Sequence, residues 1–132
     1  MASIFSKIVS GELPCYKIYE TENCLAFLDI SPLCKGHVLV VPKKEVDSIF
    51  DIEFNIYNEL WAMTKQVAKA IERSITCERV GIAVIGLEVA HAHVHLVPLQ
   101  SVEDINFSKP KISLSSQEME NVSEKIRVAL KK

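Results

Sequence analysis

Three of the four histidines in this sequence lie at alternate positions, in the segment His91-Ala92-His93-Val94-His95. Alternate side chains of an extended strand point to the same face, so the three imidazoles are expected on one face and Ala92 and Val94 on the other. A segment that only fills a core would carry Val or Leu instead, because a buried imidazole needs hydrogen-bond partners. The spacing therefore indicates a functional row of imidazoles. A row of surface histidines, or of core histidines with satisfied hydrogen bonds, is the alternative.

Two kinds of chemistry suit such a row. Histidines two residues apart on a strand can bind a metal, and His37 could supply a third ligand from elsewhere in the chain. In an ideal strand, however, His91 and His95 are about 13 Å apart at Cα, too far to share one ion easily. A row of imidazoles suits an extended phosphate group better, because it offers a nucleophile, a proton donor and hydrogen-bond donors near neutral pH. The sequence therefore favours phosphate chemistry over metal binding.

Hydrophobic periodicity and turn residues predict the elements that position this row. Helices are expected over residues 3–10 and 53–75, with a last helix capped by Ser115 or Ser116. Five strands are expected, at residues 16–19, 24–28, 37–41, 80–85 and 91–97. The runs of apolar residues in the third and fourth strands predict that both are buried. Together these elements predict an α+β fold. Its mainly antiparallel sheet has about five strands, accompanied by one long helix and a C-terminal helix in a single domain of residues 1–132.

Composition and charge exclude several classes of partner. With 15 basic and 17 acidic residues the net charge is −2, so no general positive field is available to bind nucleic acid or an anionic membrane. The longest apolar stretch, residues 80–90, is interrupted by glycines and by Glu88, and it is too short to span a bilayer. The first residues lack the layout of a signal peptide, and the four cysteines form no Cys-x-x-Cys pair. Free thiols in the cytoplasm are therefore expected.

The histidine row and three further segments carry a family resemblance. Residues 91–98, HAHVHLVP, resemble the His-x-His-x-His-x-x signature of the histidine triad (HIT) family of nucleotide hydrolases and transferases. Residues 4–14, IFSKIVSGELP, resemble the opening helix and loop of that family. Residues 25–32, LAFLDISP, and 36–43, GHVLVVPK, resemble its central signature. The four segments follow one another in the order of the family, so a HIT-like fold is expected.

The resemblance also implies a role for each matched residue. His93 would be the nucleophile that attacks the α-phosphorus and forms a nucleotidyl-histidine, and His95 would bind the phosphate and protonate the leaving group. His91 and His37 would support the site, while Asp29 would accept hydrogen bonds from the ribose hydroxyls. The apolar positions around a purine base would be Ile4, Ile8, Phe27 and Ile30. From the residues alone, Asp29 could equally be a turn residue, and Phe27 and the isoleucines could equally be core. The resemblance implies no cofactor.

The chain departs from the family pattern in three places. Many relatives bind a structural zinc through two cysteines in the opening helix and a later histidine. Here Ser3, Ser6 and Glu45 take these positions, so no metal is expected. Ahead of the histidine row, Leu87 and Glu88 replace the Gln and Ser or Thr that donate hydrogen bonds near the phosphate. Beyond Pro98 the chain carries a helix in place of the short, Trp-bearing tail of some relatives.

These observations predict a nucleotide hydrolase. The expected reaction cleaves nucleoside phosphoramidates or related nucleotidyl bonds through a covalent intermediate on His93, and it releases a nucleoside monophosphate. The substrate is then a purine nucleotide or a nucleoside phosphoramidate. Two alternatives remain: hydrolysis of dinucleoside polyphosphates, or a protein that binds or senses purine nucleotides with little turnover. The resemblance further implies a homodimer, for which the helix at 53–75 and the strand after it offer an interface.

Overall fold

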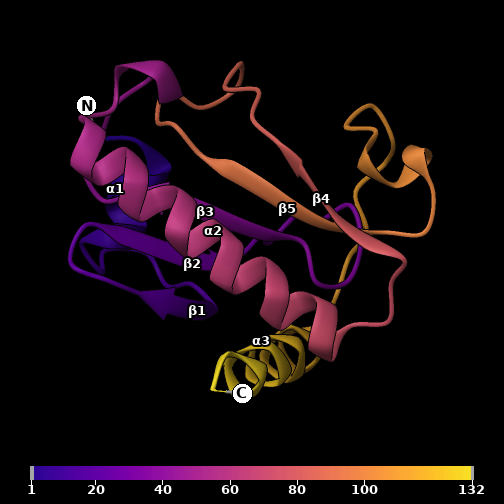
Figure 1. Cartoon of the computed structure of the whole chain (residues 1–132). Helices are drawn as coiled ribbons and strands as arrows, with labels where there is room; N and C mark the ends of the chain where they lie inside the picture. Colours follow the sequence, from indigo (N-terminus) through magenta and orange to yellow (C-terminus); the bar gives the residue numbers. More distant parts are fainter. Residues whose placement is uncertain (1, 132) are drawn as a thin grey trace.

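The computed structural model describes residues 2–131 and contains one antiparallel sheet with the strand order β1-β2-β3-β5-β4 (Figure 1). The strands are β1 Lys17–Glu20, β2 Cys24–Leu28, β3 Val38–Pro42, β4 Arg79–Ala83 and β5 Val94–Leu99. The α-helices are α1 Ile4–Val9, α2 Phe54–Ser74 and α3 Ser116–Leu130, and two short 3-10 helices are η1 Ile49–Asp51 and η2 Val102–Ile105. The predicted α+β fold is confirmed.

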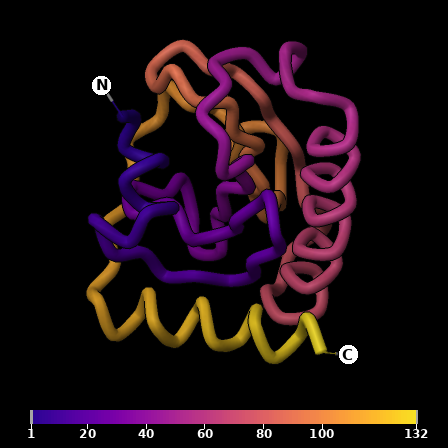
Figure 2. Tube along the Cα trace, turned by 90° about the vertical axis from the view of Figure 1, so that its left-hand side faces the viewer, coloured from indigo at the N-terminus to yellow at the C-terminus, as the bar shows by residue number. Residues whose placement is uncertain are grey.

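The two faces of the sheet bury different sets of side chains. One face packs against α2 and α3 through residues that include Ala26, Val40, Val94 and Leu96. The other face forms a smaller cluster with α1, made of Phe5, Leu25, Phe27, Leu39 and Val41. Figure 2 shows α1 and α2 on opposite sides of the sheet. Because β2 and β3 are covered on both faces, their apolar runs need no polar alternation.

Side-chain caps set the ends of two helices. The Ser3 hydroxyl accepts a 3.0 Å hydrogen bond from the Ser6 amide and begins α1. Ser115 and Glu118 form a capping box at the start of α3. From α3, Arg127 donates a 2.7 Å hydrogen bond to the Lys17 carbonyl of β1. The C-terminal helix therefore lies against the β1 edge of the sheet.

Two predicted strands differ from the structure. The sequence predicts a buried strand over 80–85, but β4 spans Arg79–Ala83 and is partly exposed, with Ile82 51% accessible. The reason is its position, since β4 is an edge strand and lacks a neighbour on its outer side within the described chain. The second difference concerns β5, which begins at Val94, so that His91 and His93 precede it.

Two further expectations concern the membrane and the cysteines. Among residues 2–131, every helix is too short or too polar to cross a bilayer. The four cysteines are free thiols, as expected, with Cys24 buried and the others partly buried.

Candidate active site

Strand register places the histidines on the α1 face of the sheet. His95 of β5 lies opposite Leu39 of β3, which in turn lies opposite Phe27 of β2. The side-chain alternation of β5 continues backwards into the preceding segment, where the Ala92 amide donates a 2.7 Å hydrogen bond to the Val46 carbonyl. Ala92 therefore joins the core on the face covered by α2 and α3, and His93 lies on the opposite face, next to α1.

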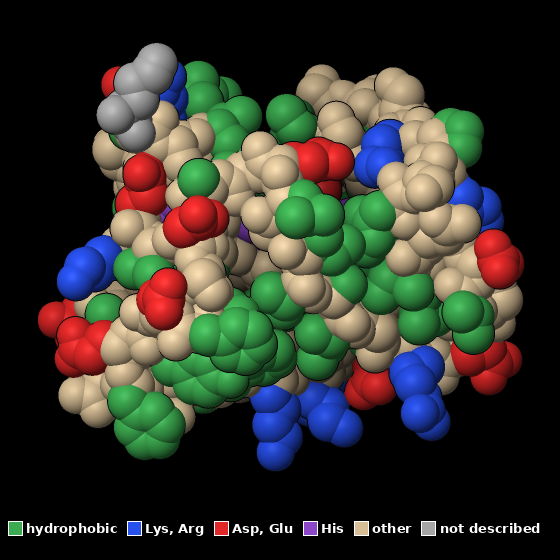
Figure 3. Space-filling view, turned by 90° about the horizontal axis from the view of Figure 1, so that it is seen from above, with side chains coloured by type: hydrophobic (Ala, Val, Ile, Leu, Met, Phe, Trp, Pro, Cys, Tyr) green, Lys and Arg blue, Asp and Glu red, His purple; other side chains and the backbone are tan. Residues whose placement is uncertain are grey.

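The imidazole rings form a contiguous row next to α1. The ring centroids of His93 and His95 are 4.9 Å apart, and Phe5 lies 4.9 Å from His93 and 5.7 Å from His91. All four histidines are at least 92% buried, and His37 and His91 are almost fully enclosed. Figure 3 shows histidine atoms only at the base of narrow openings between other side chains. The predicted row of imidazoles is present, and Phe5 packs against its first two members.

The hydrogen bond of His93 determines which of its nitrogens is free. His93 Nδ1 lies 2.7 Å from the His91 carbonyl oxygen. A carbonyl only accepts hydrogen bonds, so Nδ1 must carry the proton, and Nε2 of the neutral ring then holds the lone pair. His93 is thereby held in the tautomer that a nitrogen nucleophile requires.

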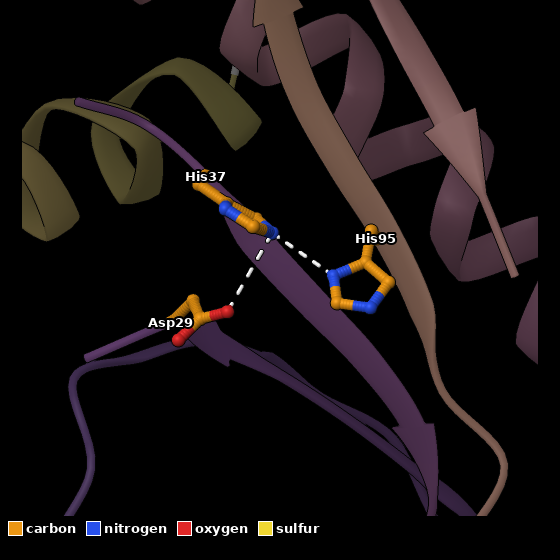
Figure 4. Close-up of side chains that lie close together, drawn as sticks. All are labelled: Asp29, His37 and His95. Atoms are coloured by element: carbon orange, nitrogen blue, oxygen red, sulfur yellow. Dashed lines mark hydrogen bonds and ion pairs between the residues drawn. The ribbon is translucent and has the colours of Figure 1, made fainter. Parts of the chain in front are cut away.

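A second hydrogen-bonded chain determines the tautomer of His95. The Leu33 amide donates a 3.0 Å hydrogen bond to His37 Nδ1, so the proton of the neutral His37 ring is on Nε2. His37 Nε2 lies 3.0 Å from His95 Nδ1, which therefore accepts (Figure 4). The remaining proton of His95 is on Nε2, on the side of the ring turned away from His37. His95 thus has a hydrogen-bond donor available to a bound group.

Burial keeps the His37–His95 pair neutral. The pKa of His37 is lowered to about 3, mainly by burial and then by the charges of His95, Lys111 and His93. The pKa of His95 is lowered to about 4 by burial first, and then by His93 and Lys111. Both rings are therefore neutral at physiological pH, as the hydrogen bonds from the Leu33 amide to His37 and from His37 to His95 require.

His91 is held in part by residues at the positions where the family resemblance implies a zinc in other members. Its Nε2–H donates to the Pro42 carbonyl at 2.7 Å, and its Nδ1 accepts from the Ser3 hydroxyl, also at 2.7 Å. The Glu45 carboxylate accepts from the Ser3 amide and the Ser6 hydroxyl, each at 2.7 Å. Zinc sites use thiolates, imidazoles and carboxylates, so this set with two hydroxyls does not fit a four-coordinate zinc. Hydrogen bonds connect these side chains instead.

One group of side chains in the described chain has the composition of a metal site. One ligand atom each from Asp29, His37 and His95 lies within 4.8 Å of the others. However, the Leu33 amide holds His37 in the tautomer whose Nε2 is protonated, and a protonated nitrogen has no lone pair for a metal. The arrangement therefore favours a hydrogen-bonded cluster over ligation.

The structure places the implied nucleotide-binding residues around the row with different degrees of exposure. Asp29 follows β2, its Oδ1 accepts from the Ser31 amide at 2.9 Å, and its Oδ2 is 3.6 Å from His37 Nε2. Phe27 is buried and packs against Phe5 at 5.8 Å between ring centroids. Three isoleucines complete the set: Ile8 is half-buried, whereas Ile4 and Ile30 are 46% and 69% accessible. Ile4 and Ile30 therefore offer accessible apolar surface, whereas Phe27 is part of the core cluster with Phe5.

The structure adds two residues that the sequence analysis missed. Phe5 was hidden among the apolar residues of the first helix. Phe107 lies in the segment between β5 and α3, and its ring centroid is 4.6 Å from that of His95. No pattern of spacing marks Phe107, because the contact joins an irregular segment to a strand.

With this geometry established, comparison with known proteins identifies the family. The family model described as HIT domain matches residues 10–102, which contain all four histidines. The chain belongs to the HIT family. It is 34% identical to an adenosine 5'-monophosphoramidase from Schizosaccharomyces pombe, over 99% of this chain and the whole of that protein.

Solved structures of HIT proteins share the fold. A HIT-like protein from Bartonella henselae, described as involved in cell-cycle regulation, has a TM-score of 0.84 at 26% identity. That comparison covers 96% of this chain and 95% of the other. A zinc-bound histidine triad family protein from Mycobacterium smegmatis has a TM-score of 0.81 at 31% identity, over 99% and 94% of the two chains. The HIT-like fold predicted from the sequence is confirmed.

Proposed function

We propose that this HIT protein hydrolyses nucleoside phosphoramidates or related nucleotidyl bonds and releases a nucleoside monophosphate. The observation that carries this proposal is the 2.7 Å contact between His93 Nδ1 and the His91 carbonyl, which leaves Nε2 as a nucleophile. The name of the Schizosaccharomyces pombe relative, an adenosine 5'-monophosphoramidase, supports the same class of substrate.

In the first step, His93 Nε2 attacks the α-phosphorus of the substrate. A bond forms between Nε2 and phosphorus while the bond from phosphorus to the leaving nitrogen or oxygen breaks. His95 Nε2–H donates a hydrogen bond to the leaving group, while His37 Nε2–H remains hydrogen-bonded to His95 Nδ1. The leaving nitrogen departs as the neutral amine from the protonated phosphoramidate, or the leaving oxygen departs as phosphate, so neither ring loses its proton. The products of this step are the released amine or phosphate and a nucleotidyl group on His93.

In the second step, water attacks the same phosphorus. His95 Nε2–H donates a hydrogen bond to a phosphate oxygen, and the water gives up one proton to the solvent as its oxygen bonds to phosphorus. The bond between His93 Nε2 and phosphorus breaks, and the nucleoside monophosphate leaves. Both histidines are returned to their starting tautomers without a cofactor.

Asp29 and the accessible isoleucines support nucleotide binding next to the row. Each oxygen of the Asp29 carboxylate can accept two hydrogen bonds, so capacity remains for two ribose hydroxyls beside the bond from Ser31. Ile4 begins α1, which packs on Phe27 through Phe5, and Ile30 follows β2; both are accessible apolar side chains. An apolar ring such as a purine would cover them and keep the ribose close to Asp29.

The test is steady-state turnover of a defined set of substrates. Purified protein would be assayed with adenosine 5'-monophosphoramidate and with a diadenosine polyphosphate, with His93→Ala as the matched control. We expect the higher kcat/KM with the phosphoramidate and a loss of about three orders of magnitude in the variant. The opposite preference would assign dinucleoside polyphosphate hydrolysis, and tight nucleotide binding without turnover of either substrate would contradict an enzyme.

We also infer a homodimer formed through β4 and α2. The outer edge of β4 has no strand partner in the described chain, and Ile82, Val84 and Ile85 next to it are 38–51% accessible. A groove of about 250 Å³ between β4 and α2 is lined in part by Trp61 and Ile82. Among residues 2–131, the buried indole N–H of Trp61 has no acceptor. An identical surface from a second chain would cover these apolar groups and offer that acceptor.

A further inference from the structure

The segment between β5 and α3, residues 100–115, passes over the histidine side of the sheet. Figure 2 shows it on the same side as α1, opposite α2. A 2.9 Å hydrogen bond from the Ile112 amide to the Pro32 carbonyl ties it to the loop between Asp29 and His37. Within the segment, Asp104 accepts bonds from the Gln100 and Ser101 amides. The segment is therefore an ordered wall next to the site.

The ring of Phe107 covers both members of the His37–His95 pair. Its centroid is 4.6 Å from His95, with an interplanar angle of 63°, and 6.0 Å from His37, with an angle of 76°. Both contacts are edge-to-face, an arrangement that aromatic rings prefer and that fixes their relative orientation. Phe107 is itself only half-buried, so it lies between the pair and solvent.

We propose that Phe107 is a positioning residue for the hydrolytic reaction: it holds the His95 ring against His37 and excludes water from their hydrogen bond. This inference rests on the proposed function, in which His95 Nε2–H donates to the leaving group. If the His95 ring turned, the donor would turn away from the leaving group while the nucleophile on His93 stayed in place.

Several charged or titratable groups surround the His37–His95 pair, but burial has the largest effect on the pKa of His95. Lys111 lies close to the ring of Phe107, with its Nζ 6.0 Å from the centroid, and it donates to the carbonyls of Phe107 and Lys109 at 2.9 and 3.4 Å. The Asp29 carboxylate is 3.6 Å from His37 Nε2, and His93 is the neighbour on the other side of His95. Burial raises the pKa of Asp29, and the charge of Glu88 adds a smaller effect in the same direction. Burial lowers the pKa of His95 more than the charges of His93 and Lys111 do, so water that reached the pair would weaken the main effect.

Protonation of His95 would break the arrangement. A doubly protonated His95 carries a hydrogen on Nδ1, which would face the Nε2–H of His37. Two donors would then oppose each other across a gap that is 3.0 Å wide in the neutral state. By keeping water away, Phe107 therefore preserves both the orientation and the neutral state of His95.

The experiment compares Phe107→Ala with Phe107→Leu, and uses Phe50→Ala as a control because Phe50 is 87% accessible on η1. Two-dimensional ¹H–¹⁵N NMR of the imidazoles gives the pKa and tautomer of His95, and steady-state kinetics with adenosine 5'-monophosphoramidate gives kcat and KM. For Phe107→Ala we expect the pKa of His95 to rise towards its ordinary value. We also expect kcat to fall about tenfold, with KM within about twofold. Phe107→Leu should retain most of the wild-type behaviour, because it also excludes water, and Phe50→Ala should change neither quantity.

An unchanged pKa, tautomer and kcat in Phe107→Ala would overturn the proposal. A lower melting temperature with no change in the pKa of His95 would also overturn it, because it would show a merely structural role. If the wild-type protein turned over no substrate, the proposed function would fail, but the NMR measurement would still decide whether Phe107 controls His95.

Discussion

At the scale of single residues, the site works through groups that can only donate or only accept. The His91 and Pro42 carbonyls and the Leu33 amide have fixed roles, so they determine where the ring protons are. The consequence is a lone pair on His93 Nε2 and a proton on His95 Nε2. The nucleophile and the hydrogen-bond donor therefore differ in tautomer, although both are imidazoles in one row.

The buried neutral histidines make a prediction about stability and pH. His37 and His95 have pKa values of about 3 and 4 in the folded protein, below the ordinary value of 6.5. Between pH 6.5 and 4 the unfolded chain therefore binds more protons, and stability falls as the pH falls. Each of these two histidines should cost about 2 kcal/mol between pH 7 and pH 5.

Urea unfolding at pH 7 and pH 5 measures this loss, and the variant His95→Gln provides the comparison. Removing one of the two groups should reduce the loss of unfolding free energy between these pH values by about 2 kcal/mol. If wild type and variant lose the same unfolding free energy between pH 7 and pH 5, His95 has the same pKa in the folded and unfolded states, and the prediction is wrong.

Glu88 makes a second prediction at this scale. Its side chain is exposed, and its charge raises the pKa of Asp29 in addition to the larger effect of burial. A negative charge near the site opposes a bound phosphate, so Glu88→Gln should tighten binding of a nucleoside monophosphate by about twofold to fivefold. The gain should shrink with added salt if the site is open to solvent.

Titration calorimetry of adenosine monophosphate at two salt concentrations measures this effect. Glu22→Gln is the matched control, since Glu22 is an exposed carboxylate in the turn between β1 and β2. Equal affinity in wild type and both variants would place Glu88 outside the electrostatic reach of the phosphate.

At the scale of elements, periodicity predicted the helices well and strand burial less well. The apolar spacing of residues 53–75 gave α2, Phe54–Ser74, because a helix that packs on a sheet must bury one stripe. The apolar run Val80–Ile85 predicts a buried strand because such runs are common in central strands, yet β4 is an edge strand. Strand order depends on which strands pair, and periodicity within one strand does not contain that information.

The site shows the same limit. The row of imidazoles could be predicted because alternation is local to one segment. Their tautomers could not, because the partner groups come from distant loops, such as the Leu33 amide and the Pro42 carbonyl. The contact of Phe107 with His95 also depends on tertiary structure.

The packing of α3 makes a prediction about cooperativity, and it supports our inference that residues 1–132 form a single domain. Ile126 is fully buried between α3 and the rest of the core, so Ile126→Ala should lower the unfolding free energy by about 2–5 kcal/mol. Fluorescence of the single tryptophan, Trp61 on α2, reports the urea transition from a different element.

Val128→Ala is the control, because this side chain on the same helix is 45% accessible and should change stability by less than about 0.5 kcal/mol. The measurements need equal protein concentration, since dimerisation also contributes to stability. If Ile126→Ala does not change the urea midpoint of the transition seen by Trp61 fluorescence, α3 unfolds separately from the sheet.

At the scale of the whole molecule, one face of the sheet packs against helices and the other carries the candidate active site. The helices α2 and α3 bury one face, and the histidine row lies on the other face with α1 (Figure 2). The β1 edge is in contact with α3, whereas the β4 edge is open within the described chain. This asymmetry is the basis for the inferred homodimer, which would extend the sheet without covering the site.

A charge at the β4 edge tests the dimer. Ile82→Asp places a carboxylate in the centre of the inferred interface, where burial without a partner is unfavourable. Light scattering after size-exclusion chromatography should give twice the chain mass for wild type and the single-chain mass for the variant. Val128→Asp on α3 should stay dimeric, and a monomeric wild type at micromolar concentration would contradict the inference.

The most direct measurement of the central claim is the detection of a nucleotidyl group on His93. Wild-type protein would be mixed with adenosine 5'-monophosphoramidate, quenched at alkaline pH before steady state, and analysed by intact mass and fragmentation. The account predicts an adenylyl group attached to His93, formed and lost at rates that match turnover and absent from His93→Ala. Turnover by the wild type without any adduct, or an adduct on another residue that persists in His93→Ala, would contradict it.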